Sequence, residues 1–148
     1  GVIDESFDVM RWALAQNDPQ GWLGMPETGY ALIALADGPF KAALDRYKYH
    51  VRHDLGTREV AQAKGAGFLW QLDGMLAGQD WVYGTQSLAD MAILPFVRQF
   101  ANTDTAWFDA QDWNNVQRWL TAFTQSDAFA AIMAKYPPWQ AGEDGVLF

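Results

Sequence analysis

Apolar residues are almost continuous from 87 to 101 (SLADMAILPFVRQFA), where Asp90 and Arg98 are the only charged residues. A helix that is apolar on every side is either a membrane span or the central helix of a bundle. This run is shorter than the about 20 apolar residues that cross a bilayer. It therefore predicts a buried central helix, and Pro95 within it predicts a kink or a lost backbone hydrogen bond near Met91.

Ser87 and Asp90 stand three residues apart at the start of this run. In a capping box, the Ser side chain caps a helix amide while the carboxylate accepts a hydrogen bond from the N–H of the cap residue. The alternative role for Asp90 is a buried general base with a raised pKa. The apolar run that follows favours the structural capping box, because this is the pattern with which a helix begins.

Helical periodicity continues on both sides of the central run, whereas no alternating run rich in β-branched residues predicts a strand. The patterns predict an all-α fold of six or seven helices around the central helix, followed by an extended tail over 137–148. Besides 87–101, the predicted helices cover residues 4–16, 29–36, 40–52, 58–76, 105–110, 113–125 and 127–135.

Turn residues and short polar residues predict where these helices begin and end. The sequence Asp37-Gly38-Pro39 predicts the end of one helix, with Pro39 in the first turn of the next. Asp112 and Ser126 are the predicted N-caps of the last two helices.

Two glycines, Gly65 and Gly67, lie inside the longest helical pattern. Each costs about 1 kcal/mol of helix stability relative to Ala. Their presence predicts that a neighbouring helix approaches closely there. Gly78 predicts the stop after this helix.

Length and charge limit the classes of function. The 148 residues are predicted to form one domain, 1–148, and the formal net charge is -8. An acidic surface argues against nucleic acid or an anionic membrane as a partner. The chain has no cysteine, so disulfides and a thiol nucleophile are excluded. We expect a cytoplasmic protein, since the opening GVIDESFDV has no signal segment. We also expect this opening to be an internal stretch of a longer protein, and Gly1 to be a remnant of cloning.

Few residues are candidates for chemistry. His50 and His53 have a spacing that suits two metal ligands on one helix face, but a third and fourth ligand are missing. No GxSxG elbow and no Gly-rich phosphate loop occurs. We therefore predict no catalytic residue, no metal and no cofactor in this chain.

The many tryptophans allow two interpretations. Aromatic side chains form a stacking site for a planar ligand in some proteins, but at helical spacing they more often belong to the core. We favour the core. The residues concerned are Trp70, Trp81, Trp107, Trp113, Trp119 and Trp139.

The segment FLWQLDGMLAGQDWVYGTQSLADMAILPFVRQFA resembles the centre of the glutathione S-transferase C-terminal domain. In that family a long helix ends in a small loop with an aromatic residue and a Gly, here WVYG at 81–84, and the capped buried helix follows. The opening DESFDVMRWAL resembles the first helix of that domain. The segments DWNNVQRWLTAF and DAFAAIMAK resemble its later helices.

The resemblance implies an all-helical domain without the thioredoxin-like N-terminal domain, which carries most of the glutathione site and the catalytic residue. The parent protein would join the thiolate of its co-substrate glutathione to a hydrophobic electrophile, and this chain alone would be inactive. The first helix would line the electrophile pocket through Phe7, Met10, Arg11 and Leu14. The surface left by the absent domain, with Val2, Ile3, Phe7 and Met10, predicts self-association or a homodimer.

Two alternatives remain open. The same helical domain occurs in proteins that resemble transferases but serve as non-catalytic protein–protein interaction modules. A third interpretation is a free-standing helical bundle that binds an apolar ligand.

Overall fold

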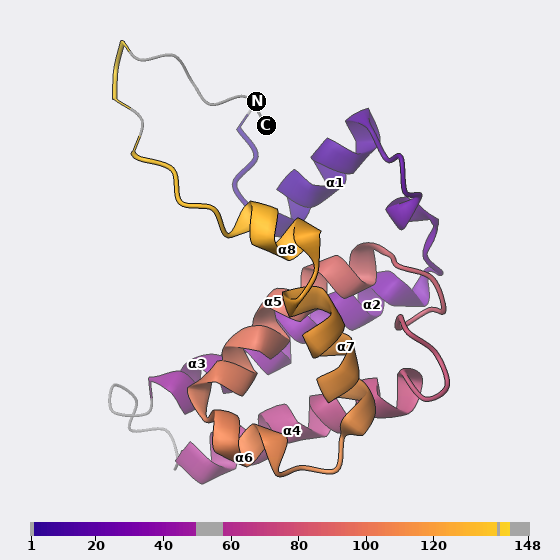
Figure 1. Cartoon of the computed structure of the whole chain (residues 1–148), viewed down its shortest axis with the longest axis vertical. Helices are drawn as coiled ribbons and strands as arrows, with labels where there is room; N and C mark the ends of the chain where they lie inside the picture. Colours follow the sequence, from indigo (N-terminus) through magenta and orange to yellow (C-terminus); the bar gives the residue numbers. More distant parts are fainter. Residues whose placement is uncertain (1, 50–57, 139, 143–148) are drawn as a thin grey trace.

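Figure 1 shows the computed structural model of the chain, which describes residues 2–49, 58–138 and 140–142. These residues contain no β-strand beyond one isolated bridge between Tyr83 and Thr85, so the all-α prediction is confirmed. The elements are α1 (Ser6–Gln16), the 3-10 turn η1 (Trp22–Gly24), α2 (Thr28–Leu35), the π-helical turn η2 (Ala36–Phe40), α3 (Lys41–Lys48), α4 (Arg58–Met75), α5 (Leu88–Thr103), α6 (Thr105–Asp109), α7 (Asn114–Thr124) and α8 (Asp127–Ile132).

Helix α5 is the centre of the bundle. It contacts α2, α3, α6 and α7, and its Leu88, Ile93, Leu94 and Val97 are buried. The helix runs without interruption through Pro95 and ends two residues beyond the predicted limit of 101. The central position explains why its sequence is apolar over most of its surface, although Pro95 and Gln99 are exposed. No helix of the described ranges has both the length and the apolar character needed to cross a membrane.

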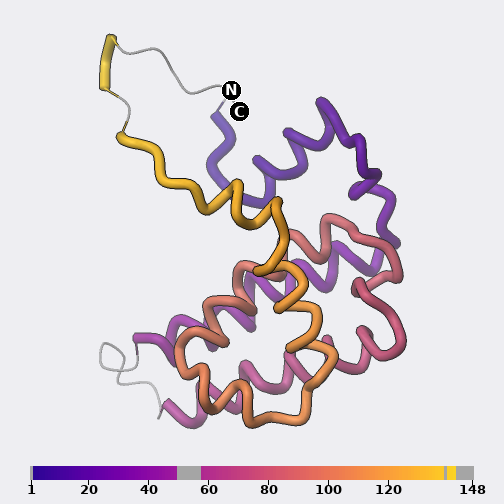
Figure 2. Tube along the Cα trace, in the orientation of Figure 1, coloured from indigo at the N-terminus to yellow at the C-terminus, as the bar shows by residue number. Residues whose placement is uncertain are grey.

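The predicted stop at residues 37–39 is wrong. Instead, η2 joins α2 to α3 without a break, so the eight α-helices of the described residues make up seven separate rods (Figure 2). The wider π-turn accommodates Pro39, which has no N–H to donate to the regular helical pattern. Burial holds this rod together, because Ile33, Phe40 and Tyr47 all face the core.

The predicted N-cap Asp112 is also wrong, because the cap of α7 comes from another helix. The Asp73 carboxylate of α4 accepts hydrogen bonds from the N–H groups of Asn115 (2.8 Å) and Val116 (3.0 Å). Asp112 lies exposed on the outside, since the following Trp113 is fully buried and turns the chain inward. The start of α7 therefore depends on a contact across 42 residues of sequence.

The two helical glycines differ. A Cβ on Gly65 would overlap the Phe100 ring of α5, so the predicted close approach is confirmed there. A Cβ on Gly67 would meet nothing within 4 Å, so the same prediction is wrong for that residue. Gly78 has a φ of 75°, as expected of the residue that ends a helix.

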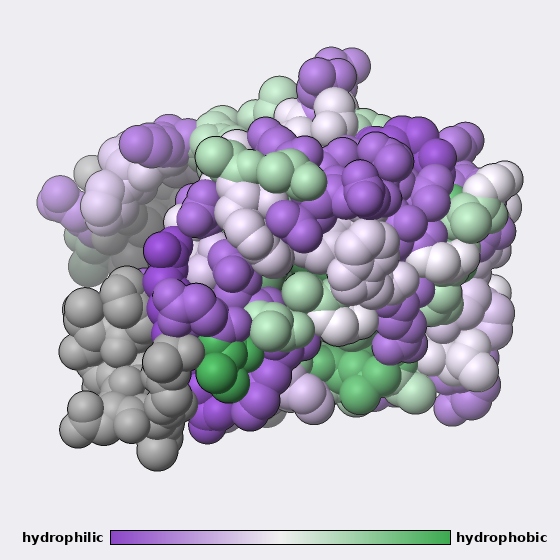
Figure 3. Space-filling model, turned by 90° about the horizontal axis from the view of Figure 1, so that it is seen from below, coloured by the Kyte–Doolittle hydropathy of each residue, from purple (hydrophilic) through white to green (hydrophobic). Residues whose placement is uncertain are grey.

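The last helix begins as predicted, because the Ser126 hydroxyl oxygen accepts a hydrogen bond from the Phe129 N–H at 3.1 Å. It ends at Ile132 instead of Lys135, and residues 134–138 leave the bundle without helical structure (Figure 1). The side seen from below the view of Figure 1 is mostly hydrophilic, with small and separate apolar areas (Figure 3).

Candidate ligand-binding site

An apolar cavity of about 390 Å³ lies where α1 and α8 meet the central helix. Its lining comes from five elements, and every lining residue is apolar. No group in this wall can act as a nucleophile, an acid or a base, so the cavity suits binding of an apolar ligand. The residues are Met10, Ala13, Leu14, Trp22, Leu88, Met91, Pro95, Phe123, Ala128 and Ile132.

Helix α1 forms one wall of the cavity without being part of the core. It has no fully buried residue, although Phe7, Met10 and Leu14 pack against the core from one face. The Phe7 ring meets Tyr30 of α2 edge-on, with ring centroids 6.4 Å apart. The Arg11 guanidinium lies about 6 Å from the centroids of both rings, at a distance suited to cation–π attraction. These contacts hold α1 beside the bundle.

The 3-10 turn η1 places Trp22 in the same wall. The Asp18 carboxylate accepts hydrogen bonds from the N–H groups of Trp22 (2.8 Å) and Leu23 (2.9 Å). Gly21, which lies between Asp18 and Trp22 in the chain, has a left-handed φ of 69°. Within the described part of the chain, the buried Trp22 Nε1 has no hydrogen-bond partner. Trp22 therefore adds its ring to the cavity lining, and its N–H remains a buried donor without a protein acceptor among the described residues.

A second cavity of about 210 Å³ continues along the inner face of α1. It shares Met10 and Pro95 with the larger one, and Phe7 belongs to its lining. Among the described residues, Asp37 is the only charged one that lines either cavity, and its carboxylate pairs with Lys41 at 3.4 Å.

Three of the four residues that the family resemblance suggested lie at these cavities. Phe7 lines the smaller cavity, Leu14 the larger and Met10 both, whereas Arg11 lines neither. The sequence reasoning missed the walls that come from η1, α5, α7 and α8. No local pattern identifies them, because their side chains meet only in the folded bundle.

Asp90 lies beside the cavity wall but is completely buried. Its Oδ1 accepts hydrogen bonds from the Val82 N–H and the Trp119 Nε1–H, each at 3.0 Å. Its Oδ2 accepts from the Ser87 N–H (3.0 Å) and hydroxyl (3.1 Å). Burial raises the pKa of the Asp90 carboxyl above its usual range, although these hydrogen bonds oppose the shift.

The other candidate residues from the sequence do not add to this site among the described residues. His50, His53 and Trp139 lie outside the described residues. Across the described ranges, no group of three or more His, Cys, Asp or Glu side chains is placed to hold a metal ion. Trp113 and Trp119 are fully buried, and Trp81 and Trp107 pack against the core, as the core interpretation expects, whereas Trp70 is 47% exposed and departs from it. The candidate site is therefore the apolar cavity itself.

Solved structures provide the comparison with known proteins, since no family model and no curated protein matches the chain. A glutathione transferase from Burkholderia graminis, with two glutathione molecules bound per subunit, has a TM-score of 0.71 at 20% identity. One from Pseudomonas putida, with one glutathione disulfide bound per subunit, has a TM-score of 0.73 at 19% identity.

Both matches cover 87% of this chain but only 58% and 60% of the respective transferases. The chain thus spans less than two thirds of the length of these proteins. The match and the strand-free structure of the described residues agree with the resemblance found in the sequence. The chain has the all-helical fold of a glutathione transferase C-terminal domain.

Proposed function

We propose that this chain is the electrophile-pocket domain of a glutathione transferase-like protein. In the parent protein, glutathione would be the co-substrate, and its thiolate would attack an electrophilic carbon of an apolar second substrate. The chain by itself would select and hold that substrate without catalysing the reaction. We also propose that the protein is cytoplasmic, which agrees with this role and with the lack of cysteine in the chain.

The observation that carries the proposal is the fully apolar cavity along α1. Its volume of about 390 Å³ falls within the range typical of small-molecule sites. Met10, Leu14 and Phe7 would contact the electrophile, and Arg11 would act by holding Phe7 in place. The two transferases of the same fold bind glutathione or its disulfide, which supports glutathione as the co-substrate.

We expect the isolated chain to bind a hydrophobic dye such as 8-anilinonaphthalene-1-sulfonate saturably, and Leu14→Gln to weaken that binding about tenfold. Replacing an apolar contact with the ligand by an amide costs roughly 1–1.5 kcal/mol of binding free energy. The measurement is a fluorescence titration of the wild-type and variant proteins.

Val9→Gln is the matched control, because Val9 is on the same helix but 43% exposed and lines neither cavity. Equal losses of affinity in the two variants would place the dye elsewhere and contradict the proposal. Calorimetry with glutathione supplies a second test, since tight binding to this chain alone would contradict the assignment of the glutathione site to another domain.

A second candidate function, a non-catalytic interaction module, is favoured by exposed apolar residues on the outer side of α1 and on the segment that precedes this helix. Val2 is 87% exposed, Ile3 40% and Trp12 55%, in addition to Val9. Phe7 and Met10 were also expected on this exposed surface, but they pack against the core instead. Exposed apolar residues of this kind mark protein–protein contact sites when they form one patch.

We propose that the chain self-associates through these exposed apolar residues, whether it is an electrophile-pocket domain or an interaction module. We expect the chain to form dimers or larger species at high concentration, and Trp12→Lys to shift it toward the monomer. Light scattering coupled to size-exclusion chromatography measures the mass. A wild-type protein that stays monomeric at high concentration would contradict the proposal. Lys135→Glu is the control, because it changes a charge in the tail, away from α1, and is expected to leave the mass unchanged.

A further inference from the structure

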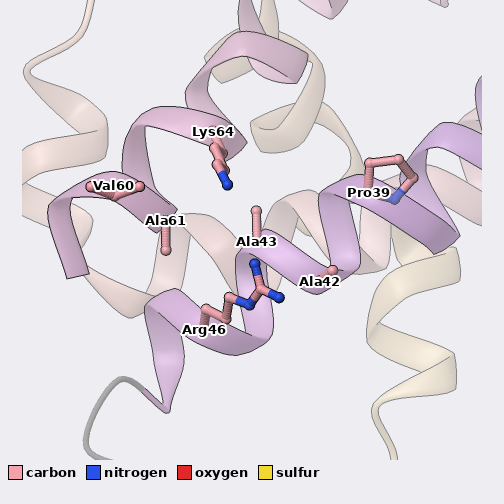
Figure 4. Close-up of a pocket in the computed structure, with 7 residues that line it drawn as sticks. All are labelled: Pro39, Ala42, Ala43, Arg46, Val60, Ala61 and Lys64. Atoms are coloured by element: carbon pink, nitrogen blue, oxygen red, sulfur yellow. The ribbon is translucent and has the colours of Figure 1, made fainter. Parts of the chain in front are cut away.

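A groove of about 230 Å³ runs between α3 and α4, on a part of the bundle that the apolar cavity does not reach. Its floor consists of small or apolar residues from both helices, and two cationic residues stand at its sides. Figure 4 shows Lys64 reaching from α4 toward Ala43, and Arg46 rising from α3 toward the same space. The lining residues are Pro39, Ala42, Ala43, Arg46, Val60, Ala61 and Lys64.

The two cations have no protein partner within the described residues. Lys41 pairs with Asp37 and Arg58 with Asp104, but neither Arg46 nor Lys64 makes a hydrogen bond or an ion pair there. Lys64 is exposed and Arg46 is partly buried, and both side chains line the same groove. Because like charges repel, two unpaired cations facing one groove favour an anion between them.

We propose that the groove between α3 and α4 binds a carboxylate carried on a short apolar body. The Arg46 guanidinium offers paired N–H donors that match a carboxylate, and the Lys64 ammonium adds a point charge. The floor of Ala42, Ala43 and Ala61 has no side chain long enough to fill the groove, and it would contact the apolar body of the ligand. A small free acid and the C-terminus of a peptide both provide this chemistry.

The test is an NMR titration of the backbone amides at constant ionic strength, with butyrate, acetyl-alanyl-alanine and n-butanol as separate probes. We expect saturable shifts at Ala42, Ala43 and Ala61 with a Kd in the millimolar range for at least one of the two carboxylates. Tighter binding of butyrate identifies a free acid as the source, and tighter binding of the peptide identifies a C-terminus. The neutral n-butanol is expected to cause no saturable shift.

The double variant Arg46→Gln, Lys64→Gln is expected to weaken carboxylate binding at least tenfold. Lys48→Gln, Lys135→Gln removes the same charge outside the groove and is expected to keep the affinity within about twofold. Both pairs lie on the surface, and the dispersion of the amide spectrum checks that each variant is folded. The proposal is overturned if the shifts do not saturate, if n-butanol reproduces them, or if both double variants lose affinity equally.

Discussion

Asp90→Ala is expected to lower the free energy of unfolding by about 3–5 kcal/mol, the largest effect that we predict for a single substitution. The variant leaves the Val82 N–H, the Ser87 N–H and the Trp119 Nε1–H without their acceptor in a region closed to water. Each buried donor without a partner costs roughly 1–3 kcal/mol. The three donors belong to the loop before α5, to its N-cap and to α7, so the carboxylate connects segments that are separate in sequence.

Urea denaturation followed by tryptophan fluorescence measures this effect. Asp112→Ala is the matched control, since Asp112 is an exposed acid that caps nothing, and its loss is expected to change stability by no more than about 0.5 kcal/mol. A loss below about 1 kcal/mol for Asp90→Ala would show that the four hydrogen bonds do not stabilise the fold as we infer.

The stability lost in Asp90→Ala is also expected to depend on pH. Burial raises the pKa of Asp90 in the folded state, so the folded protein holds this proton more tightly than the unfolded chain does. The stability contributed by Asp90 is then fully present below about pH 4 and declines as the pH rises through the raised pKa. The stability difference between wild type and Asp90→Ala should therefore be larger at pH 4 than at pH 7. The opposite trend would indicate that the hydrogen bonds outweigh the effect of burial on the pKa.

Gly65→Ala is expected to destabilise the fold by about 1–2 kcal/mol, although Ala is the better helix former. The added methyl group would overlap the Phe100 ring. That ring cannot move aside easily, because it is buried and packs against Phe40 and Tyr47 with centroid distances of 5.4 and 5.0 Å. Overpacking of a core typically costs 1–3 kcal/mol and outweighs the gain of about 1 kcal/mol in helix propensity.

Gly67→Ala is the control for this substitution, with the opposite expected sign. It lies two residues away on the same helix, and a Cβ there meets nothing within 4 Å. We expect it to stabilise the protein by about 0.5–1 kcal/mol, through helix propensity alone. Thermal unfolding of the two variants separates the effects. A rise in Tm for both would mean that α4 and α5 can move apart at little cost.

The sequence was sufficient for those features that depend on neighbouring residues. The apolar run identifies α5 as the central helix, since a central position removes most of its apolar side chains from water. The Ser126 cap of α8 and the stop at Gly78 are also local, because each involves hydrogen bonds or backbone angles within one turn. The sequence pattern likewise placed Phe7, Met10 and Leu14 on one face of α1.

Contacts between segments that are distant in the sequence could not be predicted from local patterns. Asp73 caps α7 from α4, and only the packing of those helices brings the carboxylate to the two N–H groups. Gly65 and Gly67 are equivalent in sequence, but Phe100 approaches only one of them.

The candidate site was also predictable only in part. The face of α1 was predictable, but the cavity also needs Trp22, Pro95 and Ile132, which come from three other elements. The groove between α3 and α4 likewise exists only because Arg46 and Lys64, 18 residues apart in the chain, face one space. By itself the sequence determined where most helices lie and which helix is central, because helical periodicity and local caps depend on neighbouring residues, whereas the join at 37–39 and the end of α8 were not predicted. The tertiary structure alone decided which surfaces are concave and which charges lack a partner, because both depend on how the helices pack.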